Sequence, residues 1–200
     1  MSINDNSKVI LTDCDGVLLD WEFAFHTWMW KKGFTPEADH KLFYRIEDQY
    51  GITRSEKHNL VRMFNESAAI GFLPPFRDAV HYVKKLHEQH GYIFHVITSL
   101  STDKYAGELR IKNLRKMFGE TTFDDFIILD TGADKDEALS QYKDSECYWI
   151  EDHIENVQAG MNAGLTGLLM EHQHNMHFTG CPLFKNWKGI YNYITGTMAP

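Results

Sequence analysis

Five short apolar runs are spaced along the chain, with amphipathic segments between them. The runs cover residues 9–12, 92–97, 126–129, 147–150 and 166–170. Each is almost continuously hydrophobic, which is typical of strands that are covered on both faces in a parallel sheet. The segments between the later runs have helical periodicity and end at glycines, as crossover helices do. The pattern predicts an α/β fold with a Rossmann-like parallel sheet flanked by helices.

The first two predicted strands are separated by roughly 70 residues, far more than one crossover needs. This stretch predicts three helices: residues 21–32, a second that starts with Thr35 as N-cap and Pro36 as the first helical residue and runs to about residue 50, and a third over about 54–69. We therefore expect a small helical cap at residues 20–71, inserted after the first strand. The core domain would comprise residues 1–19 and 72–200. A module in this position can act as a lid.

Polar residues follow every apolar run. They are Asp13, Thr98 with Ser99, Asp130, Glu151 with Asp152, and Glu171 with His172. In an open α/β sheet the carboxyl ends of the strands line the ligand crevice. The sequence therefore predicts a functional site at this edge of the sheet.

The amino-acid composition limits the class of protein and the compartment that we expect for it. Apolar residues at 43% and aromatic residues at 14% argue against disorder, and the net charge of −8 disfavours a nucleic-acid polymer as partner. No apolar run is long enough to span a membrane, and the polar start of the chain does not resemble a secretory signal. Three cysteines, without a C-x-x-C pair, fit a reducing compartment. We expect a cytoplasmic protein without a membrane partner.

The first strand ends in the stretch "TDCDG", which places Asp13 and Asp15 side by side before Gly16. A carboxylate at a strand end can act as a nucleophile, and the second carboxylate can reach the same ligand if the chain turns at the glycine. Two neighbouring anions call for a cation, and Mg²⁺ prefers carboxylate oxygens and commonly bridges to phosphate. Taken alone, this stretch fits an ordinary acidic turn equally well.

Four stretches in order, "VILTDCDGV", "FHVITS", the lysine of "GADKDEAL" and "YWIEDHIENVQAGMNAGL", resemble the haloacid dehalogenase superfamily of aspartate-nucleophile phosphatases. The resemblance covers residues 8–20 and 72–170. It implies that Asp13 attacks phosphorus and becomes an aspartyl-phosphate. Asp15 would protonate the leaving alcohol and later deprotonate the attacking water.

The resemblance also implies roles for residues at other strand ends. Thr98 would donate a hydrogen bond to the transferring phosphoryl group, with Ser99 as a further substrate contact. Lys135 would neutralise charge on the nucleophile and the phosphoryl group. The alternatives are that Thr98 only caps the following turn, and that Lys143 is the lysine of this motif.

For the metal, the resemblance implies that Asp13, the backbone carbonyl of Asp15 and Asp152 hold Mg²⁺. The fourth motif departs from the commoner family pattern, because Glu151 precedes Asp152 and Asn156 stands where many members have a second acid. Whether Glu151 and Asn156 take part in the metal site is left open.

The cap is rich in aromatic residues, and Trp21, Phe25 and Trp28 share one helical face. They fit a core for the cap itself. Alternatively, Trp21 and Phe25 stack on a nucleobase of the substrate. Two stretches are loosely similar to the 5′(3′)-deoxyribonucleotidases of the superfamily, although Arg77 and Asp78 replace the proline–glycine usual in that branch.

We expect a Mg²⁺-dependent phosphomonoester hydrolase for a small phosphorylated metabolite, with (deoxy)nucleoside 5′-monophosphates as the leading class, in a monomer or homodimer. A phosphomutase shares the aspartate pair. A 2-haloacid dehalogenase usually lacks the second aspartate, so Asp15 argues against it. A binding module with impaired catalysis is the non-enzymatic alternative. Three histidines after the last strand, His172, His174 and His177, fit a solvated loop better than a metal cluster.

Overall fold

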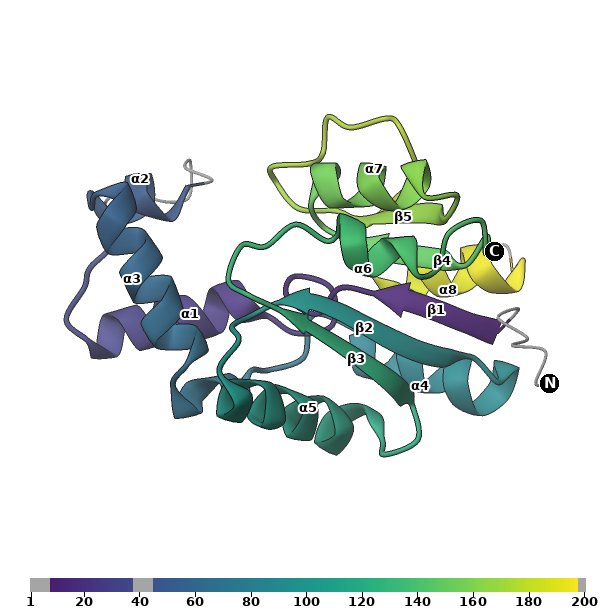
Figure 1. The fold of residues 1–200 in the computed structure, drawn as a ribbon, viewed down its shortest axis with the longest axis horizontal. Coiled ribbons are helices and arrows are strands. Elements are labelled where there is room, and N and C mark those ends of the chain that lie inside the picture. The colour runs from purple at the N-terminus through teal and green to yellow at the C-terminus, as the bar shows by residue number, and fades with distance from the viewer. Residues whose placement is uncertain (1–7, 38–44, 198–200) are drawn as a thin grey trace.

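The computed structural model describes residues 8–37 and 45–197, and its centre is a parallel sheet (Figure 1). The strands are β1 (Val9–Thr12), β2 (Ile93–Ser99), β3 (Phe123–Leu129), β4 (Tyr148–Glu151), β5 (Thr166–Met170) and β6 (Leu183–Phe184). Their spatial order is β3-β2-β1-β4-β5-β6, and each neighbouring pair is parallel. The predicted α/β fold and its five strands are confirmed. β6 was not predicted, because two residues carry no pattern.

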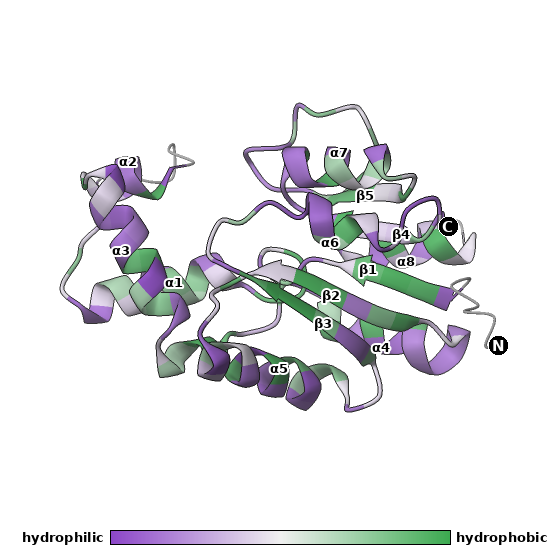
Figure 2. Ribbon diagram, in the orientation of Figure 1, coloured by the Kyte–Doolittle hydropathy of each residue, from purple (hydrophilic) through white to green (hydrophobic). Residues whose placement is uncertain are grey.

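Helices cover both faces of this sheet. They are α4 (Ala79–His90), α5 (Lys104–Phe118), α6 (Asp136–Ser140), α7 (Ile154–Asn162) and α8 (Trp187–Thr195). Ile10 of β1 packs in the buried cluster with α4, α5 and α8, whereas Leu11 packs in the cluster with α6 and α7. Because successive side chains point to opposite faces, strands covered on both sides must be continuously apolar. Figure 2 shows this as largely hydrophobic strands beneath helices with polar outer sides.

Helical elements lie beyond one end of the sheet (Figure 1). They are α1 (Trp21–Lys31), α2 (Ile46–Tyr50), α3 (Arg54–Asn65) and the short 3₁₀ helix η3 (Ala68–Phe72). Phe25, Met29 and Phe64 are fully buried between them. These elements fall within residues 20–72, and their assignment to a separate cap domain stays a prediction. In the part of the chain that the structure describes, no helix has the length and apolarity needed to cross a membrane.

The second predicted cap helix is wrong at its start. Residues 34–37 are not helical, although Thr35 and Pro36 have the composition of a helix start. The backbone N–H of Glu37 donates to the carbonyl of Gln49 at 2.7 Å, and residues so far apart cannot be bonded in this way within one helix. Residues 38–44 of this prediction lie outside the described residues. α2 begins only after Arg45, and it ends at a left-handed glycine as predicted.

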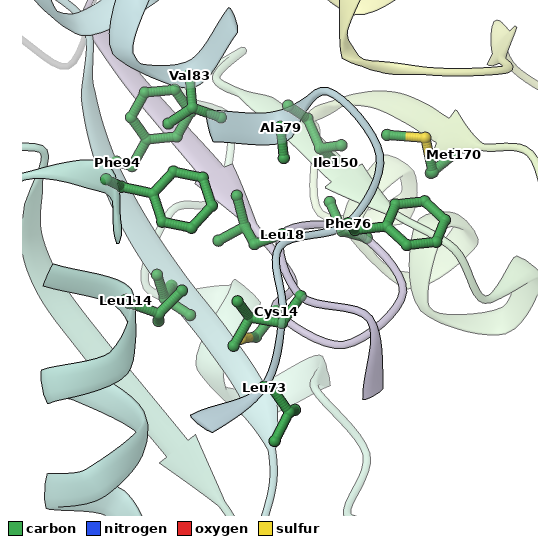
Figure 3. Close-up of a cluster of buried hydrophobic side chains, with 14 of the residues drawn as sticks. Cys14, Leu18, Leu73, Phe76, Ala79, Val83, Phe94, Leu114, Ile150 and Met170 are labelled. Atoms are coloured by element: carbon green, nitrogen blue, oxygen red, sulfur yellow. The ribbon is translucent and has the colours of Figure 1, made fainter. Parts of the chain in front are cut away.

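The loop after β1 is held by the core beneath it. The carbonyl of Cys14 accepts hydrogen bonds from the backbone N–H groups of Leu18 and Leu19 at 2.8 and 2.9 Å, and Gly16 has a φ of +72°. Leu18 is fully buried and lies among Phe94, Ile150 and Phe76 (Figure 3). The apolar residues that follow the two aspartates therefore anchor the loop that carries them.

Candidate active site

Asp13 stands at the middle of the sheet, directly after β1. Its backbone N–H donates to the carbonyl of Ile150 in β4 at 2.9 Å, and its side chain is 10% exposed. The strand order runs outward from β1 to β2 and β3, and then crosses back to β4, β5 and β6. Ligands of open α/β sheets bind at such a switch point, outside the carboxyl ends of the strands.

Lys135 lies between two carboxylates at this point. Its Nζ is 2.8 Å from Oδ1 of Asp13 and 2.6 Å from Oε1 of Glu151, and its side chain is buried. Burial lowers the pKa of Lys135, but the two carboxylates outweigh it and the net pKa is raised, so the ammonium keeps its charge. Lys143, the other lysine considered for this place, is exposed on the surface.

Glu151 is the anchor of that lysine. Its Oε1 also accepts from Nδ2 of Asn156 at 2.8 Å, and its Oε2 accepts from the backbone N–H groups of Asp152 and His153, each at 2.6 Å. Burial raises the pKa of Glu151, but Lys135 and these hydrogen bonds more than offset it, and the net pKa is lowered. Both oxygens of Glu151 are already engaged. The geometry therefore gives Glu151 and Asn156 a role in fixing Lys135 and Asp152.

Three carboxylates can present oxygens within 4.8 Å of one another: Asp13, Glu151 and Asp152. Burial raises the pKa of Asp13 to about 7 against the opposing effect of Lys135, with Glu151 and Asp15 adding to the rise. Burial, and then Glu151 and Asp13, raise the pKa of Asp152 well above its usual range. A buried and a half-buried carboxyl group that lack enough positive charge fit a hard divalent cation such as Mg²⁺. Asp13 and Asp152 could hold it.

Asp15 is bound by an arginine that the sequence did not indicate. Nη1 and Nη2 of Arg110 in α5 donate to Oδ1 and Oδ2 of Asp15 at 2.6 and 3.3 Å. The arginine side chain is fully buried, while that of Asp15 is 24% exposed and lines the cleft described below. Two hydrogen bonds from one guanidinium to the two oxygens of a carboxylate fix the plane of that carboxylate. The sequence contains one indication of this role: Arg110 places a charge among the apolar residues of a helical face that includes Ala106 and Leu114.

The two hydroxyl residues after β2 differ in their surroundings. Thr98 is buried, and its Oγ1 has no hydrogen-bond partner within the described part of the chain. A buried hydroxyl without a partner is uncommon and suits a donor reserved for a ligand. The Oγ of Ser99 donates to the carbonyl of Ala133 at 2.8 Å. The geometry thus gives the Ser99 hydroxyl a bond that stabilises the loop before Lys135.

A cleft of about 980 Å³ opens beside the aspartates. Its walls include Asp13, Asp15 and Asp152 from the core, Trp21 from α1, and several cap residues discussed below. Trp21 is half-buried, its ring stacks on Phe25 at 4.7 Å, and its Nε1 donates to Asn65 at 3.0 Å. Phe25 of α1 is fully buried and does not line the cleft. Of the two aromatic residues predicted to touch substrate, Trp21 alone is placed to do so.

The histidine loop after β5 also reaches this cleft. His172 and His174 line it, whereas His177 is exposed elsewhere on the loop. Nε2 of His172 lies 2.8 Å from the carbonyl oxygen of Gly16 and 3.8 Å from Oδ2 of Asp152. At Gly16 a side chain would have no room, because a Cβ would come within 2.4 Å of that same Oδ2. The loop is therefore part of the site, which the spacing of its histidines did not indicate.

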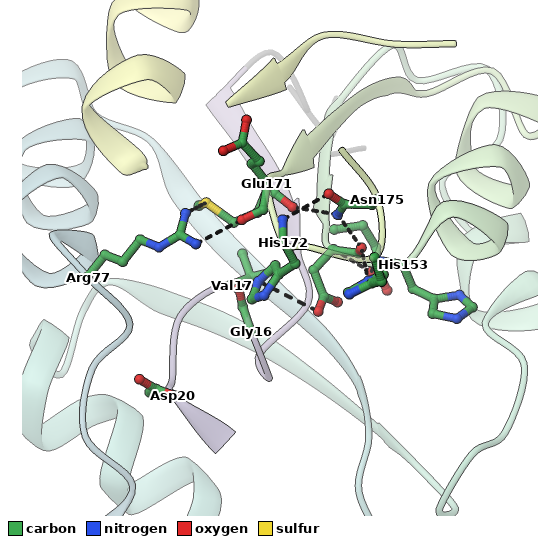
Figure 4. A network of polar contacts seen from close by, with 12 residues as sticks. Gly16, Val17, Asp20, Arg77, His153, Glu171, His172 and Asn175 are labelled. Atoms are coloured by element: carbon green, nitrogen blue, oxygen red, sulfur yellow. Dashed lines mark hydrogen bonds and ion pairs between the residues drawn. The ribbon is translucent and has the colours of Figure 1, made fainter. Parts of the chain in front are cut away.

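Asn175 holds that loop in place (Figure 4). It is fully buried, and its Nδ2 lies 2.7 Å from the carbonyl oxygen of Asp152 and 2.8 Å from that of Met170. Its Oδ1 accepts from the backbone N–H of His172 at 2.8 Å. One side chain thus connects the end of β5, the His172 loop and the loop that carries Asp152.

Comparison with known proteins agrees with this architecture. No protein-family model matches the chain. A stretch of 143 residues is 27% identical to an uncharacterized 32.4 kDa protein in the Gp30-rIII intergenic region of Enterobacteria phage T4. The match covers 68% of this chain and 49% of that protein, so it spans about half the length of this curated relative.

Several solved structures share the fold. A haloacid dehalogenase-like family hydrolase from Streptococcus pneumoniae superposes with a TM-score of 0.66 at 15% identity, over 94% of this chain and 98% of that one. A hydrolase of the same family from Deinococcus radiodurans, with bound phosphate and sodium, gives 0.59 at 17% identity over 96% and 98%. The D,D-heptose 1.7-bisphosphate phosphatase from B. bronchiseptica, complexed with magnesium and phosphate, gives 0.57 at 10% identity over 96% and 99%.

At these identities the likeness shows the fold. The chain has the fold of the haloacid dehalogenase-like hydrolases, and the resemblance predicted from its motifs is confirmed at that level. The similarity to the deoxyribonucleotidase branch stays a prediction.

Proposed function

We propose that the chain is a Mg²⁺-dependent phosphomonoester hydrolase that works through an aspartyl-phosphate on Asp13. The observation that carries the proposal is the buried Asp13 at the switch point of the sheet, with Lys135 at one oxygen and Asp152 beside it. Two structures of the same fold contain phosphate, one with magnesium and one with sodium, which supports a phosphate ester as the substrate.

In this mechanism a carboxylate oxygen of Asp13 attacks phosphorus, and the bond from phosphorus to the alcohol oxygen breaks. The alcohol leaves with a proton from Asp15. Water then attacks the aspartyl-phosphate, Asp15 takes its proton, and inorganic phosphate leaves with Asp13 restored. Lys135 and the hydroxyl of Thr98 would stabilise charge on the phosphoryl oxygens.

Mg²⁺ held by Asp13, Asp152 and the backbone carbonyl of Asp15 would offset the charge that gathers on the phosphoryl group. The raised pKa of Asp13 supports this requirement, because the carboxylate must be ionised to attack and the metal-free site disfavours ionisation.

For the substrate we propose a small phosphorylated metabolite, with nucleoside 5′-monophosphates as the first class to test. Trp21 supports that choice, since it lines the cleft and could contact a base. Equal rates with nucleoside and sugar monophosphates would argue against a base contact.

The test is hydrolysis of p-nitrophenyl phosphate, with inorganic phosphate measured as product. We expect turnover by the wild type that requires Mg²⁺, and a loss of about a thousandfold or more in Asp13→Asn. Asp130→Asn is the matched control, because this exposed carboxylate also follows a strand but, among the described residues, accepts a hydrogen bond from the neighbouring Thr131 N–H alone. Turnover unchanged in Asp13→Asn would contradict the proposal, as would a folded wild type without activity. Transfer to a second hydroxyl, without release of phosphate, would indicate a phosphomutase.

A further inference from the structure

The cap side of the cleft presents three cationic side chains. Arg45 immediately precedes α2, and Arg54 and Lys57 lie in the first turn of α3, three residues apart and therefore on one face of that helix. All three line the same cleft as Asp13 and Asp152. The amino-terminal end of a helix adds positive potential at this wall.

These three side chains take no part in the ion pairs of the described residues. None of Arg45, Arg54 and Lys57 forms an ion pair with a carboxylate of residues 8–37 or 45–197. Elsewhere on the same helix, Arg62 is paired with Glu66 at 2.9 Å. As far as the described part of the chain is concerned, the cations at the wall can therefore bind a ligand.

Three carboxylates also line this side of the cleft: Asp20, Glu22 and Glu47. Oδ1 of Asp20 accepts from the backbone N–H of Phe23 at 3.1 Å, and Oε1 of Glu22 lies 3.5 Å from Nε2 of His26. Within residues 8–37 and 45–197 none of the three forms an ion pair with a cation of this wall, so the cations are not neutralised by direct contact.

The cleft is large enough to hold more than the phosphate group that reacts at Asp13. A volume of about 980 Å³ is at the upper end of what small-molecule sites have, and one phosphate beside Asp13 fills only a part of it. The cleft therefore has room for the rest of a substrate beside the residues of the cap that line it.

We propose that the substrate carries a second anionic group, a phosphate or a carboxylate, which Arg54 and Lys57 bind while the first phosphate reacts at Asp13. This rests on the proposed phosphatase function and narrows it to bisphosphates or phosphorylated carboxylic acids. Arg45 adds to the field at the same wall. Charge-assisted hydrogen bonds from the guanidinium make the second anion a specificity element.

The test compares matched substrates that differ in the second anion. The pairs are adenosine 5′-monophosphate with adenosine 3′,5′-bisphosphate, fructose 6-phosphate with fructose 1,6-bisphosphate, and glycerol 3-phosphate with 3-phosphoglycerate. We expect kcat/KM to be about tenfold higher or more for the doubly anionic member of a pair. A preference in the bisphosphate pairs alone would identify phosphate, and one in the last pair alone would identify carboxylate.

The double variant R54Q/K57Q should abolish the preference by raising KM for the doubly anionic member about tenfold more than for the singly anionic member. K112Q/K116Q is the matched control, since it removes two exposed charges from one face of α5, away from the cleft. The control should keep the preference. A wild type without preference, or equal losses for both members of each pair in R54Q/K57Q, would overturn the proposal.

Binding measurements distinguish a failure of this inference from a failure of the proposed phosphatase function. Calorimetry on Asp13→Asn with Mg²⁺ requires no turnover, and adenosine 3′,5′-bisphosphate should bind about tenfold more tightly than adenosine 5′-monophosphate. Adding R54Q/K57Q should remove the difference. Equal affinities in Asp13→Asn would overturn the second-anion site even if the wild type proves to be a phosphatase. A preference in binding, together with a wild type that shows no turnover, would support the second-anion site and contradict the phosphatase proposal.

Discussion

At the scale of single residues, the ion pair between Asp15 and Arg110 joins positions that are 95 residues apart. The guanidinium is fully buried, and burial lowers its pKa, but Asp15 and Cys14 more than compensate and the net pKa is raised. A buried arginine stays charged and needs its partner. We infer that Arg110 is a positioning residue, which holds the carboxylate of Asp15 at the edge of the cleft.

Arg110→Met should lower kcat at least about tenfold, because the carboxylate of Asp15 loses its orientation. The free energy of unfolding should fall by only about 1–3 kcal/mol, since Asp15 can be hydrated from the cleft. Urea denaturation and steady-state kinetics measure the two effects. Arg115→Met removes another arginine from α5 and is the control.

A double-mutant cycle with Asp15→Asn sharpens this test. The double variant Asp15→Asn/Arg110→Met should be more stable than the sum of the single losses predicts, because neither member leaves an unpaired charge. Its activity should stay low. Additive losses in stability, or full activity in Arg110→Met, would show that the pair does not position Asp15.

At the scale of elements, the loop after β5 connects three parts of the site through Asn175. Asn175→Ala removes the partners of two carbonyls and one N–H, at Asp152, Met170 and His172. We expect a loss of about 2–4 kcal/mol in the free energy of unfolding. The affinity for Mg²⁺ should fall about tenfold or more, as it does when residues supporting a metal ligand are removed.

Metal titration followed by calorimetry, together with thermal unfolding, measures both effects. Met176→Ala is the matched control, because this side chain belongs to the same loop and is 59% exposed. If Asn175→Ala loses stability but binds Mg²⁺ as the wild type does, the loop has a structural role alone.

The helices and strands differ in how well the sequence predicts them. The strands could be predicted because burial on both faces leaves a continuous apolar run, as in β1 and β5, whose bounds match the prediction. The prediction of the second cap helix failed at its start, because the backbone hydrogen bond between Glu37 and Gln49 depends on tertiary structure. α8 was missed as well. The N–H groups of Trp187 and Lys188 at its start are bound by Asp78, more than 100 residues earlier in the chain.

At the scale of the whole molecule, the candidate site forms where distant segments meet at one edge of the sheet. Asp13 and Asp152 could be proposed from the sequence because they follow the ends of strands, and Lys135 because of the order of the motifs. Arg110 and Asn175 could not be found in this way, since their partners are set by how helix and loop pack on the sheet. The cationic wall of the cap depends on how α2 and α3 are placed over the strand ends.

The central claim is that Asp13 becomes phosphorylated during turnover. Rapid acid quenching of the wild type, mixed with a ³²P-labelled substrate and Mg²⁺, followed by peptide mapping, tests it most directly. We predict a transient, acid-stable label on the peptide that contains Asp13, at no more than one phosphate per chain, and no label in Asp13→Asn. Substrate turnover without any label on that peptide, or a label that persists in Asp13→Asn, would contradict the account.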